Sequence, residues 1–130
     1  MKLPELPDTL KYTASHEWIA DNGDGTVTVG ITAVAAEQLG DLVYVELPAV
    51  GTSVARAGNC AVVESTKAAA EVYAPVSGEV VAANAELAEH PERVNESPYG
   101  TGWLFKLRLA DASELGSLLA RDEYAKSAGV

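Results

Sequence analysis

Short runs of β-forming residues, separated by turn signals, are the feature of this sequence that most restricts its fold. Residues 26–31, Thr-Val-Thr-Val-Gly-Ile, alternate polar and apolar side chains with the period of a strand that buries one face. The preceding Asp-Asn-Gly-Asp-Gly, residues 21–25, supplies positions that tolerate positive φ, so a hairpin with residues 12–20 is predicted. The pattern favours a mainly β protein.

The same signals predict more strands further along the chain. Strands are expected at residues 41–47 and 103–109, and residues 51–88 are typical of strand, turn, strand, turn and strand. Aromatic residues make up only 6% of the chain, so the core must consist mainly of Val, Leu, Ile and Ala, which suits a flattened β-barrel or sandwich. At 130 residues, a single domain over residues 1–130 is expected, with no need for a disulfide or metal.

A few short helices are predicted beside the strands. Thr32 is placed as an N-cap and Gly40 as the end of a helix, on which Val34, Ala35 and Leu39 are expected to share one face. The period of this segment differs from that of a strand. One short helix is therefore expected between two strands.

A C-terminal helical cap is expected over residues 111–127. The sequence Asp-Ala-Ser-Glu that begins at Asp111 matches a capping box, in which Asp111 would accept a hydrogen bond from the backbone N–H of Glu114. Three leucines are expected on one face of the helix that follows: Leu115, Leu118 and Leu119. A second short helix is expected around Tyr124.

Net charge limits the partners of this chain. The formal charge of −10 and the pI near 4.5 argue against nucleic acid and against anionic membrane surfaces, which need clustered Lys and Arg. Basic protein surfaces fit better. No run approaches the ~20 apolar residues of a membrane span, and the N-terminus lacks the features of a signal peptide. We expect a cytoplasmic location, or the mitochondrial matrix for a processed organellar protein.

Residues that could support catalysis or bind a metal are few. Cys60 is the only cysteine, and it lies in an apolar run without a basic neighbour, so a buried structural thiol is expected. His16 and His90 are far apart and have no Cys or Asp cluster beside them, so no metal site is expected. The chain also has no nucleophile elbow and no phosphate loop, so it is not expected to be an enzyme.

Lys67 is unusual for its surroundings. It is the only basic residue between Arg56 and Arg93. Six glutamates share that stretch: Glu64, Glu71, Glu79, Glu86, Glu89 and Glu92. Burying an unpaired ammonium would cost several kcal/mol, so Lys67 should project from the turn between two strands. Spacing alone favours an ordinary solvated lysine with Glu64 as a weak surface partner.

The residues around Lys67 resemble a known motif. Val-Glu-Ser-Thr-Lys-Ala at residues 63–68, followed by Ala-Pro-Val-Ser-Gly-Glu-Val at residues 74–80, resembles the lipoyl-attachment hairpin of glycine cleavage H proteins. That family usually has Glu-Ser-Val-Lys-Ala and then Ser-Pro-Val-Ser-Gly-Glu-Val. Other segments that resemble the family follow in the same order: Tyr12 with Ser15-His16-Glu17-Trp18, residues 29–32, 37–41, 45–48 and 98–104. Departures are Thr66 in place of Val, Ala69 and Ala70 in place of small polar residues, and Ala74 in place of Ser. The resemblance spans about residues 10–124.

This resemblance implies a fold and a function. The fold would be of the biotinyl/lipoyl-attachment (hammerhead) type, with the attachment hairpin inside residues 51–88. Lys67 would carry lipoate through an amide bond, put in place by a lipoate ligase or lipoyltransferase. The carrier would take an aminomethyl group from the pyridoxal-phosphate-dependent glycine decarboxylase to the folate-dependent aminomethyltransferase, and dihydrolipoyl dehydrogenase would reoxidise it. A monomer is expected, because a shuttling carrier needs a free surface.

The resemblance also implies roles for four polar residues near the lysine. Glu64 would help the lipoylating enzyme to recognise the hairpin. Ser15, Glu17 and Glu71 would form a cleft that docks the protonated amine of the loaded arm and shields it from loss. Each of these carboxylates is also explained as an ordinary surface charge.

Three related readings compete with this one. Biotin carriers use a similar hairpin but typically flank their lysine with methionines, whereas Thr66 and Ala68 flank Lys67 here. Lipoyl domains of 2-oxoacid dehydrogenases often have Asp-Lys-Ala and are shorter. A relay protein that donates its lipoyl group to other complexes would have the same hairpin, and the residues do not separate this role from glycine cleavage.

Overall fold

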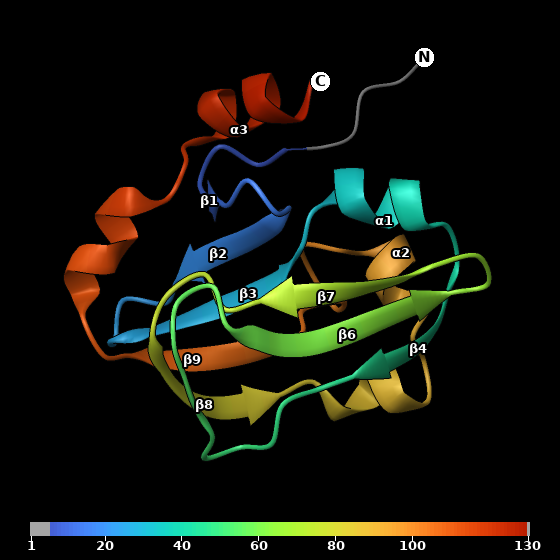
Figure 1. Ribbon diagram of the computed structural model, residues 1–130, viewed down its shortest axis with the longest axis horizontal. Coiled ribbons are helices and arrows are strands. Elements are labelled where there is room, and N and C mark those ends of the chain that lie inside the picture. Colours follow the sequence, from blue (N-terminus) through green and yellow to red (C-terminus); the bar gives the residue numbers. More distant parts are fainter. Residues whose placement is uncertain (1–5, 130) are drawn as a thin grey trace.

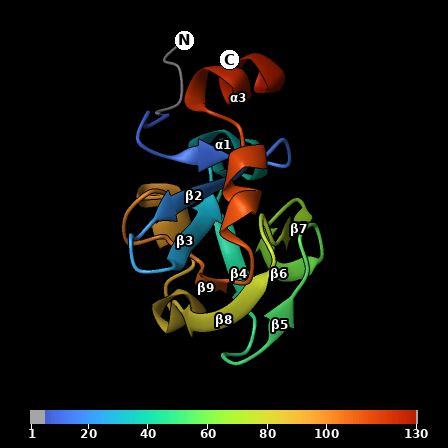
Figure 2. The ribbon, with the colours of Figure 1, turned by 90° about the vertical axis from the view of Figure 1, so that its left-hand side faces the viewer.

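The computed structural model describes residues 6–129, within which the strands form two antiparallel sheets. Six strands lie in the order β1-β2-β3-β9-β8-β5 and three in the order β4-β6-β7. The strands are β1 (Lys11–Tyr12), β2 (Glu17–Asp21), β3 (Thr26–Ile31), β4 (Leu42–Glu46), β5 (Ser53–Val54), β6 (Asn59–Ser65), β7 (Ala69–Tyr73), β8 (Gly78–Ala83) and β9 (Phe105–Leu109). Figure 1 shows the smaller sheet in front of the larger one, and Figure 2 shows the molecule turned by 90°. The predicted mainly β, sandwich-like fold is confirmed.

Short helices connect or cover the strands. They are α1 (Ala33–Leu39), α2 (Arg93–Glu96), α3 (Arg121–Ala128) and the 3-10 helices η1 (Ala85–Ala88) and η2 (Ala112–Ser117). In Figure 1, α1 lies beside the hairpin of β6 and β7, and α3 lies over the end of the sheet that begins with β1. Within residues 6–129, none of the helices has the length and apolar character needed to cross a membrane.

The β2–β3 hairpin forms where the sequence predicts it. The backbone N–H of Gly23 donates to the Asp21 carboxylate at 2.9 Å, and Gly23 and Gly25 adopt φ of 81° and 88°. These φ values cost a glycine little, because it has no Cβ. Apolar Val27 and Val29 are fully buried, while Thr26 and Thr28, which alternate with them, are only half-buried.

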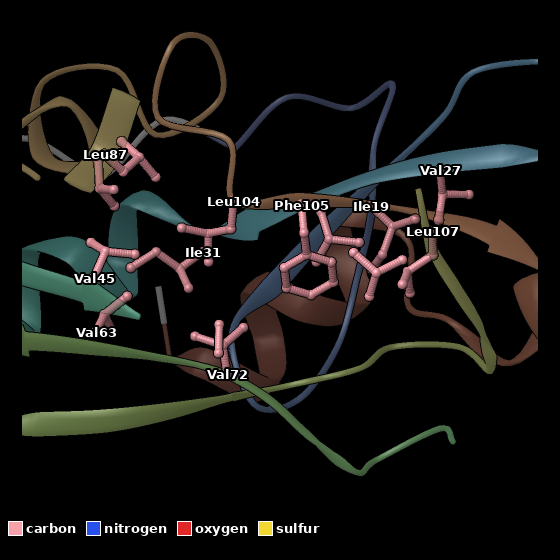
Figure 3. Packing of buried hydrophobic residues seen from close by; sticks show 14 of the residues in the cluster. Ile19, Val27, Ile31, Val45, Val63, Val72, Leu87, Leu104, Phe105 and Leu107 are labelled. Carbon is pink, nitrogen blue, oxygen red and sulfur yellow. The ribbon is translucent and has the colours of Figure 1, made fainter. Parts of the chain in front are cut away.

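The main hydrophobic core fills the space between the two sheets, as Figure 3 shows. Phe105 and Leu107 of β9 reach into it from the larger sheet, and both side chains are fully buried. Val63 of β6 and Val72 of β7 reach into it from the smaller sheet. Burying a Val or Leu side chain stabilises a fold by about 1.5–3 kcal/mol. The β6–β7 hairpin is therefore anchored by its apolar residues.

Helix α1 has the predicted ends but not the predicted face. The Thr32 side chain accepts a hydrogen bond from the Ala35 N–H at 3.2 Å, and Gly40 ends the helix at φ 83°. Val34, however, packs in a second apolar cluster, whereas Ala35 and Leu39 pack against the main core. The predicted common face is wrong because the helix lies in the corner between two clusters.

The second cluster lies beside β1 and α3. Its buried members are aromatic or branched: Tyr12, Trp18, Val34 and Tyr124. Gly30 pairs with Trp18 across β2 and β3, and a Cβ at this glycine would lie 2.6 Å from the Trp18 ring. The indole therefore packs directly on the backbone of β3, and the Trp18 N–H donates to the carbonyl of Pro98 at 2.9 Å.

The C-terminal helical segment is present, but its capping differs from the prediction. The Asp111 carboxylate accepts from the Ser113 N–H at 3.0 Å rather than from Glu114. The Glu114 carboxylate instead accepts from the backbone N–H of Ser77 at 2.7 Å, across the fold. The local capping signal therefore did not reveal the tertiary partner of Glu114, which is the residue directly before β8.

The three C-terminal leucines do not share one helical face, so that prediction is wrong. Helix η2 ends at Ser117, before two of them. Leu115 and Leu118 pack against the main core, whereas Leu119 packs in the second cluster. Leu119 also exchanges two backbone hydrogen bonds of 2.8 Å with Tyr12, which attaches the C-terminal segment to β1.

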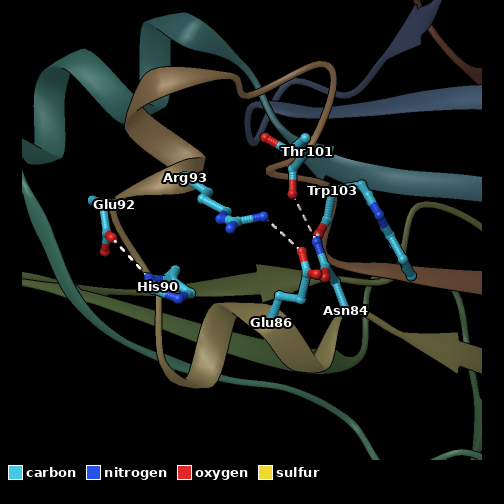
Figure 4. A network of polar contacts seen from close by, with 7 residues as sticks. All are labelled: Asn84, Glu86, His90, Glu92, Arg93, Thr101 and Trp103. Atoms are coloured by element: carbon cyan, nitrogen blue, oxygen red, sulfur yellow. Dashed lines mark hydrogen bonds and ion pairs between the residues drawn. The ribbon is translucent and has the colours of Figure 1, made fainter.

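A polar network orders the long connection between β8 and β9 (Figure 4). The buried Asn84 amide donates to the carbonyls of Thr101 and Trp103, both at 2.8 Å. Nearby, Arg93 pairs with Glu86 at 2.7 Å and His90 with Glu92 at 3.2 Å, all in exposed or half-exposed positions. His90 therefore lies at the surface, and the buried Asn84 amide ties the start of the connection to its end.

Candidate functional site

Lys67 lies at the exposed tip of the β6–β7 hairpin, which projects at the right-hand edge of Figure 1. The Ser65 N–H donates to the Ala68 carbonyl at 2.7 Å, and the Ser65 hydroxyl oxygen accepts from the Ala68 N–H at 3.1 Å. Val63 and Val72 at the base of the hairpin are each only 1% exposed. The hairpin thus combines a buried base with an exposed lysine at its tip.

The Lys67 side chain lies against the end of α1. A Cβ on Gly40 would come within 3.3 Å of its Cε, so glycine leaves room for the aliphatic part of the lysine. Among residues 6–129, no carboxylate lies within ion-pair distance of the Lys67 ammonium. The expected weak pairing with Glu64 is therefore absent, and the amine is left to react.

Glu64 lies on β6, three residues before Lys67. It is half-buried and faces Tyr44 of β4 and Ala69 of β7 across the smaller sheet. Tyr44 is one of the large apolar or aromatic side chains that remain exposed, at 49%. Glu64 and Tyr44 together form an accessible surface close to the lysine.

Ser15 and Glu17 come together in the tight turn between β1 and β2. One oxygen of the Glu17 carboxylate accepts from the hydroxyls of Thr13, at 2.5 Å, and of Ser15, at 2.7 Å. The other oxygen accepts from the backbone N–H of Tyr73 at 3.4 Å, at the end of β7. Glu17 is only 1% exposed, so the turn holds a buried carboxylate against the base of the lysine hairpin.

A pocket of about 510 Å³ opens beside this carboxylate. Its walls come from the β1–β2 turn, the β5–β6 connection, the end of β7 with the residues after it, and the C-terminal segment. They include Ser15, Glu17, Arg56, Tyr73, Pro75 and Leu118. Arg56 forms no ion pair with Glu17 among the described residues. The Glu17 carboxylate is therefore held by hydrogen bonds, and no cation among residues 6–129 is paired with it.

Glu71 does not line this pocket, in contrast to the predicted three-residue cleft. It is exposed and lines a separate hollow of about 250 Å³ with Glu46 and Cys60. Its link to the pocket is Tyr73, because hydrogen bonding to the Glu71 carboxylate raises the pKa of Tyr73. Val72 points into the core, so Glu71 and Tyr73 share the opposite face of β7, and of these two only Tyr73 lines the pocket.

Burial raises the pKa of Glu17 above its ordinary value, although hydrogen bonds from Thr13, Ser15 and the Tyr73 backbone act in the opposite direction. A carboxylate in this state gains from a cation placed beside it, because water screens the pair less than at an open surface. Glu17 is thus suited to hold a protonated amine.

The stability of the fold should depend on the titration of Glu17. Because its folded-state pKa is raised, the folded chain binds the proton more tightly than the unfolded chain between about pH 4.3 and the folded value. The free energy of unfolding of the wild type, relative to Glu17→Gln, should therefore fall as pH rises through that window. Urea unfolding of both proteins at pH 4, 5, 6 and 7 measures the difference. A difference that is constant or rises with pH would contradict it.

Several residues of the site carry no sequence signal of their own. Thr13 is recognisable only as a hydroxyl near Ser15, and Tyr73 contributes its backbone N–H, which any residue supplies.

Cys60 is half-buried rather than fully buried, and burial raises the pKa of its thiol to about 11. The thiol is thus protonated at neutral pH and a poor nucleophile. In the described part of the chain, no group of His, Cys, Asp or Glu is arranged to hold a metal.

The fold and the hairpin define a small β protein that presents one lysine on a rigid support. A family model described as Glycine cleavage H-protein matches residues 10–129. The chain is 54% identical to the glycine cleavage system H protein of Laribacter hongkongensis, over 98% of this chain and 100% of that protein. It is 52% identical to the H protein of Pseudoalteromonas translucida, over 96% and 97%. The chain belongs to the glycine cleavage H-protein family.

A solved structure supports the fold. A crystal structure of a glycine cleavage system H protein from Mycobacterium marinum superposes with a TM-score of 0.87. The two chains are 43% identical, and the match covers 96% of this chain and 100% of the other. The expected hammerhead-type architecture with short helices is therefore confirmed by a relative as well as by the strand topology.

Proposed function

We propose that this chain is the lipoyl carrier of a glycine cleavage system, with lipoate attached to Lys67. The observation that carries the proposal is a lysine on an exposed turn, with no ion-pair partner within residues 6–129, above a base held by buried Val63 and Val72. A rigid base with an accessible tip is what a residue needs when it is modified by one enzyme and visits several others. The lipoyl group supplies the sulfur chemistry when bound, and the chain supplies its presentation.

The proposal extends to partners and location. Glycine decarboxylase, aminomethyltransferase and dihydrolipoyl dehydrogenase would each receive the arm, and a lipoate ligase or lipoyltransferase would attach it, with Glu64 as a recognition contact. The whole of residues 1–130 would act as one non-catalytic domain and as a monomer in the cytoplasm. The net charge of −10 supports docking to basic surfaces around the partners' active sites.

The length of a lipoyl-lysine arm fits the distance from the hairpin tip to the pocket. Tyr73 contacts the Glu17 carboxylate and lies six residues after Lys67. At roughly 3.3 Å per strand residue this spans about 20 Å. An extended arm from the Lys67 Cα to the amine of its cargo has about 16 bonds of roughly 1.5 Å, which also advance about 20 Å once bond angles are included. Ser15 and Glu17 would then hold the protonated amine.

Native protein should carry one lipoyl group on Lys67. Lys67 lies at the tip of an exposed hairpin turn, where an acyl-transferring enzyme can reach its amine. Intact-mass and peptide mass spectrometry of protein purified from its own host under lipoate-replete conditions measures the adduct and its position. A chain that remains wholly unmodified there, or an adduct on another lysine, would overturn the assignment.

Removing the Glu17 charge should speed the loss of the cargo amine from the loaded arm. We expect Glu17→Gln to lose it about tenfold faster, because one charge-assisted contact of roughly 1.5 kcal/mol disappears. Glu71→Gln should have a smaller effect, because Glu71 lies outside the pocket and acts through Tyr73. Single-turnover release of ammonia from loaded wild type and variants measures the rates. Wild-type retention in both variants would refute the role of the pocket, and Glu79→Gln, on β8, serves as the surface control.

A further inference from the structure

His16 has a backbone conformation that needs support from its surroundings. Its φ is 74°, in a region that residues other than glycine adopt uncommonly. His16 also lies between Ser15 and Glu17, so its backbone conformation sets the directions in which both neighbouring side chains point. A strained residue of this kind persists only where contacts around it hold it in place.

The contact that holds His16 comes from the other end of the chain. The Tyr124 hydroxyl of α3 lies 2.6 Å from the His16 Nδ1 and 2.8 Å from the Thr32 Oγ1. Burial lowers the pKa of His16, so its ring is neutral at pH 7 and the Nδ1 can accept from the Tyr124 hydroxyl. Tyr124 can in turn accept from Thr32, whose oxygen also accepts the Ala35 N–H that caps α1.

Tyr124 is itself rigidly placed. Its ring stacks on Tyr12 with 4.9 Å between centroids and an interplanar angle of 14°, and both side chains are fully buried. The His16 ring meets Tyr124 edge-on at 5.7 Å. The backbone carbonyl of His16 accepts from the Thr32 N–H at 3.0 Å. One tyrosine thus connects the Glu17 turn, the start of α1 and the C-terminal helix.

We propose that Tyr124 and His16 are positioning residues that hold the Ser15–Glu17 turn in the geometry that receives the cargo amine. The inference rests on the proposed amine-binding role of the pocket. The C-terminal helix would therefore control retention of the cargo, although none of its residues lines the pocket. The Tyr124 hydroxyl acts by fixing the His16 backbone, and this backbone keeps the Glu17 carboxylate buried beside Ser15.

The first test uses the full-length chain without lipoate. Tyr124→Phe keeps the stacked ring and removes only the hydroxyl, so the turn should loosen and the Glu17 carboxyl should become more exposed to water. Carbon NMR of the Glu17 carboxyl should then show its pKa falling toward the ordinary value, because burial is the largest cause of its rise. Tyr12→Phe is the matched control, since it removes the other buried hydroxyl of the same stack, which donates to Pro7 rather than to His16. It should leave the Glu17 pKa unchanged.

His16→Asn provides an independent variant, because asparagine tolerates positive φ but lacks the imidazole that Tyr124 holds. It should lower the Glu17 pKa in the same way and keeps the test decisive if Tyr124→Phe fails to fold. A Glu17 pKa that stays at the wild-type value in the folded variants, or that falls equally in Tyr12→Phe, would overturn the inference. Neither result would affect the assignment of Lys67, which is decided by the mass of the native protein.

The second test uses the loaded carrier. Tyr124→Phe should release ammonia roughly fivefold faster than wild type, the size expected for losing one ordinary hydrogen bond. Tyr12→Phe should release it at the wild-type rate. Glu17→Gln is the reference variant. If Glu17→Gln also releases ammonia at the wild-type rate, the pocket does not bind the amine. The Glu17 pKa measured by NMR then decides by itself whether Tyr124 positions the turn. Fast release from Glu17→Gln with wild-type release from Tyr124→Phe would overturn the inference.

Discussion

Lys67→Arg should abolish lipoylation and, with it, every carrier reaction of the chain. The guanidinium of arginine stays protonated at neutral pH and cannot form the amide that a lysine amine forms. The substitution keeps the positive charge on an exposed turn, so the free energy of unfolding should change by less than about 0.5 kcal/mol. Intact mass after incubation with a lipoylating enzyme, and glycine cleavage activity with the three partner enzymes, measure the loss.

Lys11→Arg is the matched control for this prediction. Lys11 is another exposed lysine, and it lies on β1 in the six-stranded sheet rather than on the β6–β7 hairpin. This variant should gain one lipoyl group and support the full activity. Lipoyl incorporation that persists in Lys67→Arg would show that another lysine is the attachment site. Loss of incorporation in both variants would show that neither result reports on Lys67.

Phe105→Ala should lower the free energy of unfolding by about 3–5 kcal/mol. Phe105 is fully buried and lies in the centre of the core between the two sheets, as Figure 3 shows. Valine and leucine side chains surround it, and a backbone held in two paired sheets cannot collapse to fill the space left by the ring. Urea unfolding followed by Trp fluorescence measures the change.

Two further substitutions test the reason for that loss. Phe105→Leu keeps most of the volume and should cost less than Phe105→Ala. Val50→Ala removes an apolar side chain that is 63% exposed and should change stability by less than about 0.5 kcal/mol. A loss below about 1 kcal/mol in Phe105→Ala would show that the core is not packed as the structure has it.

Features with a local cause were predictable from the sequence. The turn before β3 needed residues that tolerate positive φ, and Gly23 and Gly25 provide them. The N-cap of α1 needed a side-chain oxygen, and Thr32 provides it. An ammonium in a Val-rich region needed access to water, and Lys67 lies on the hairpin tip. In each case, the physical requirement and the residues that satisfy it lie within a few positions of one another.

Features that depend on distant partners were not predictable in this way. The Glu114 N–H was expected to donate to the Asp111 carboxylate but donates to the Asp111 backbone carbonyl, while the Glu114 carboxylate accepts from Ser77 across the fold. Val34 was expected on the same face as Ala35 but packs in the other cluster. In both cases the local pattern offers a reasonable partner, and the tertiary fold provides one that the pattern cannot reveal.

The sequence by itself indicated the exposure of Lys67, the family resemblance and the alternation of strands and turns, because residue type and local order encode them directly. Only the tertiary structure decided which carboxylate becomes buried. Glu17 and Glu71 are both acidic residues on strands, but Glu71 lies on the outward face of β7, whereas hydrogen bonds from Thr13 and Ser15 hold Glu17 in the pocket wall. Tyr124 of α3 contacts the neighbouring His16 from 108 residues away. Burial and hydrogen bonding across more than a hundred residues are properties of the folded chain, and they set the charge environment in which a cargo amine would be held.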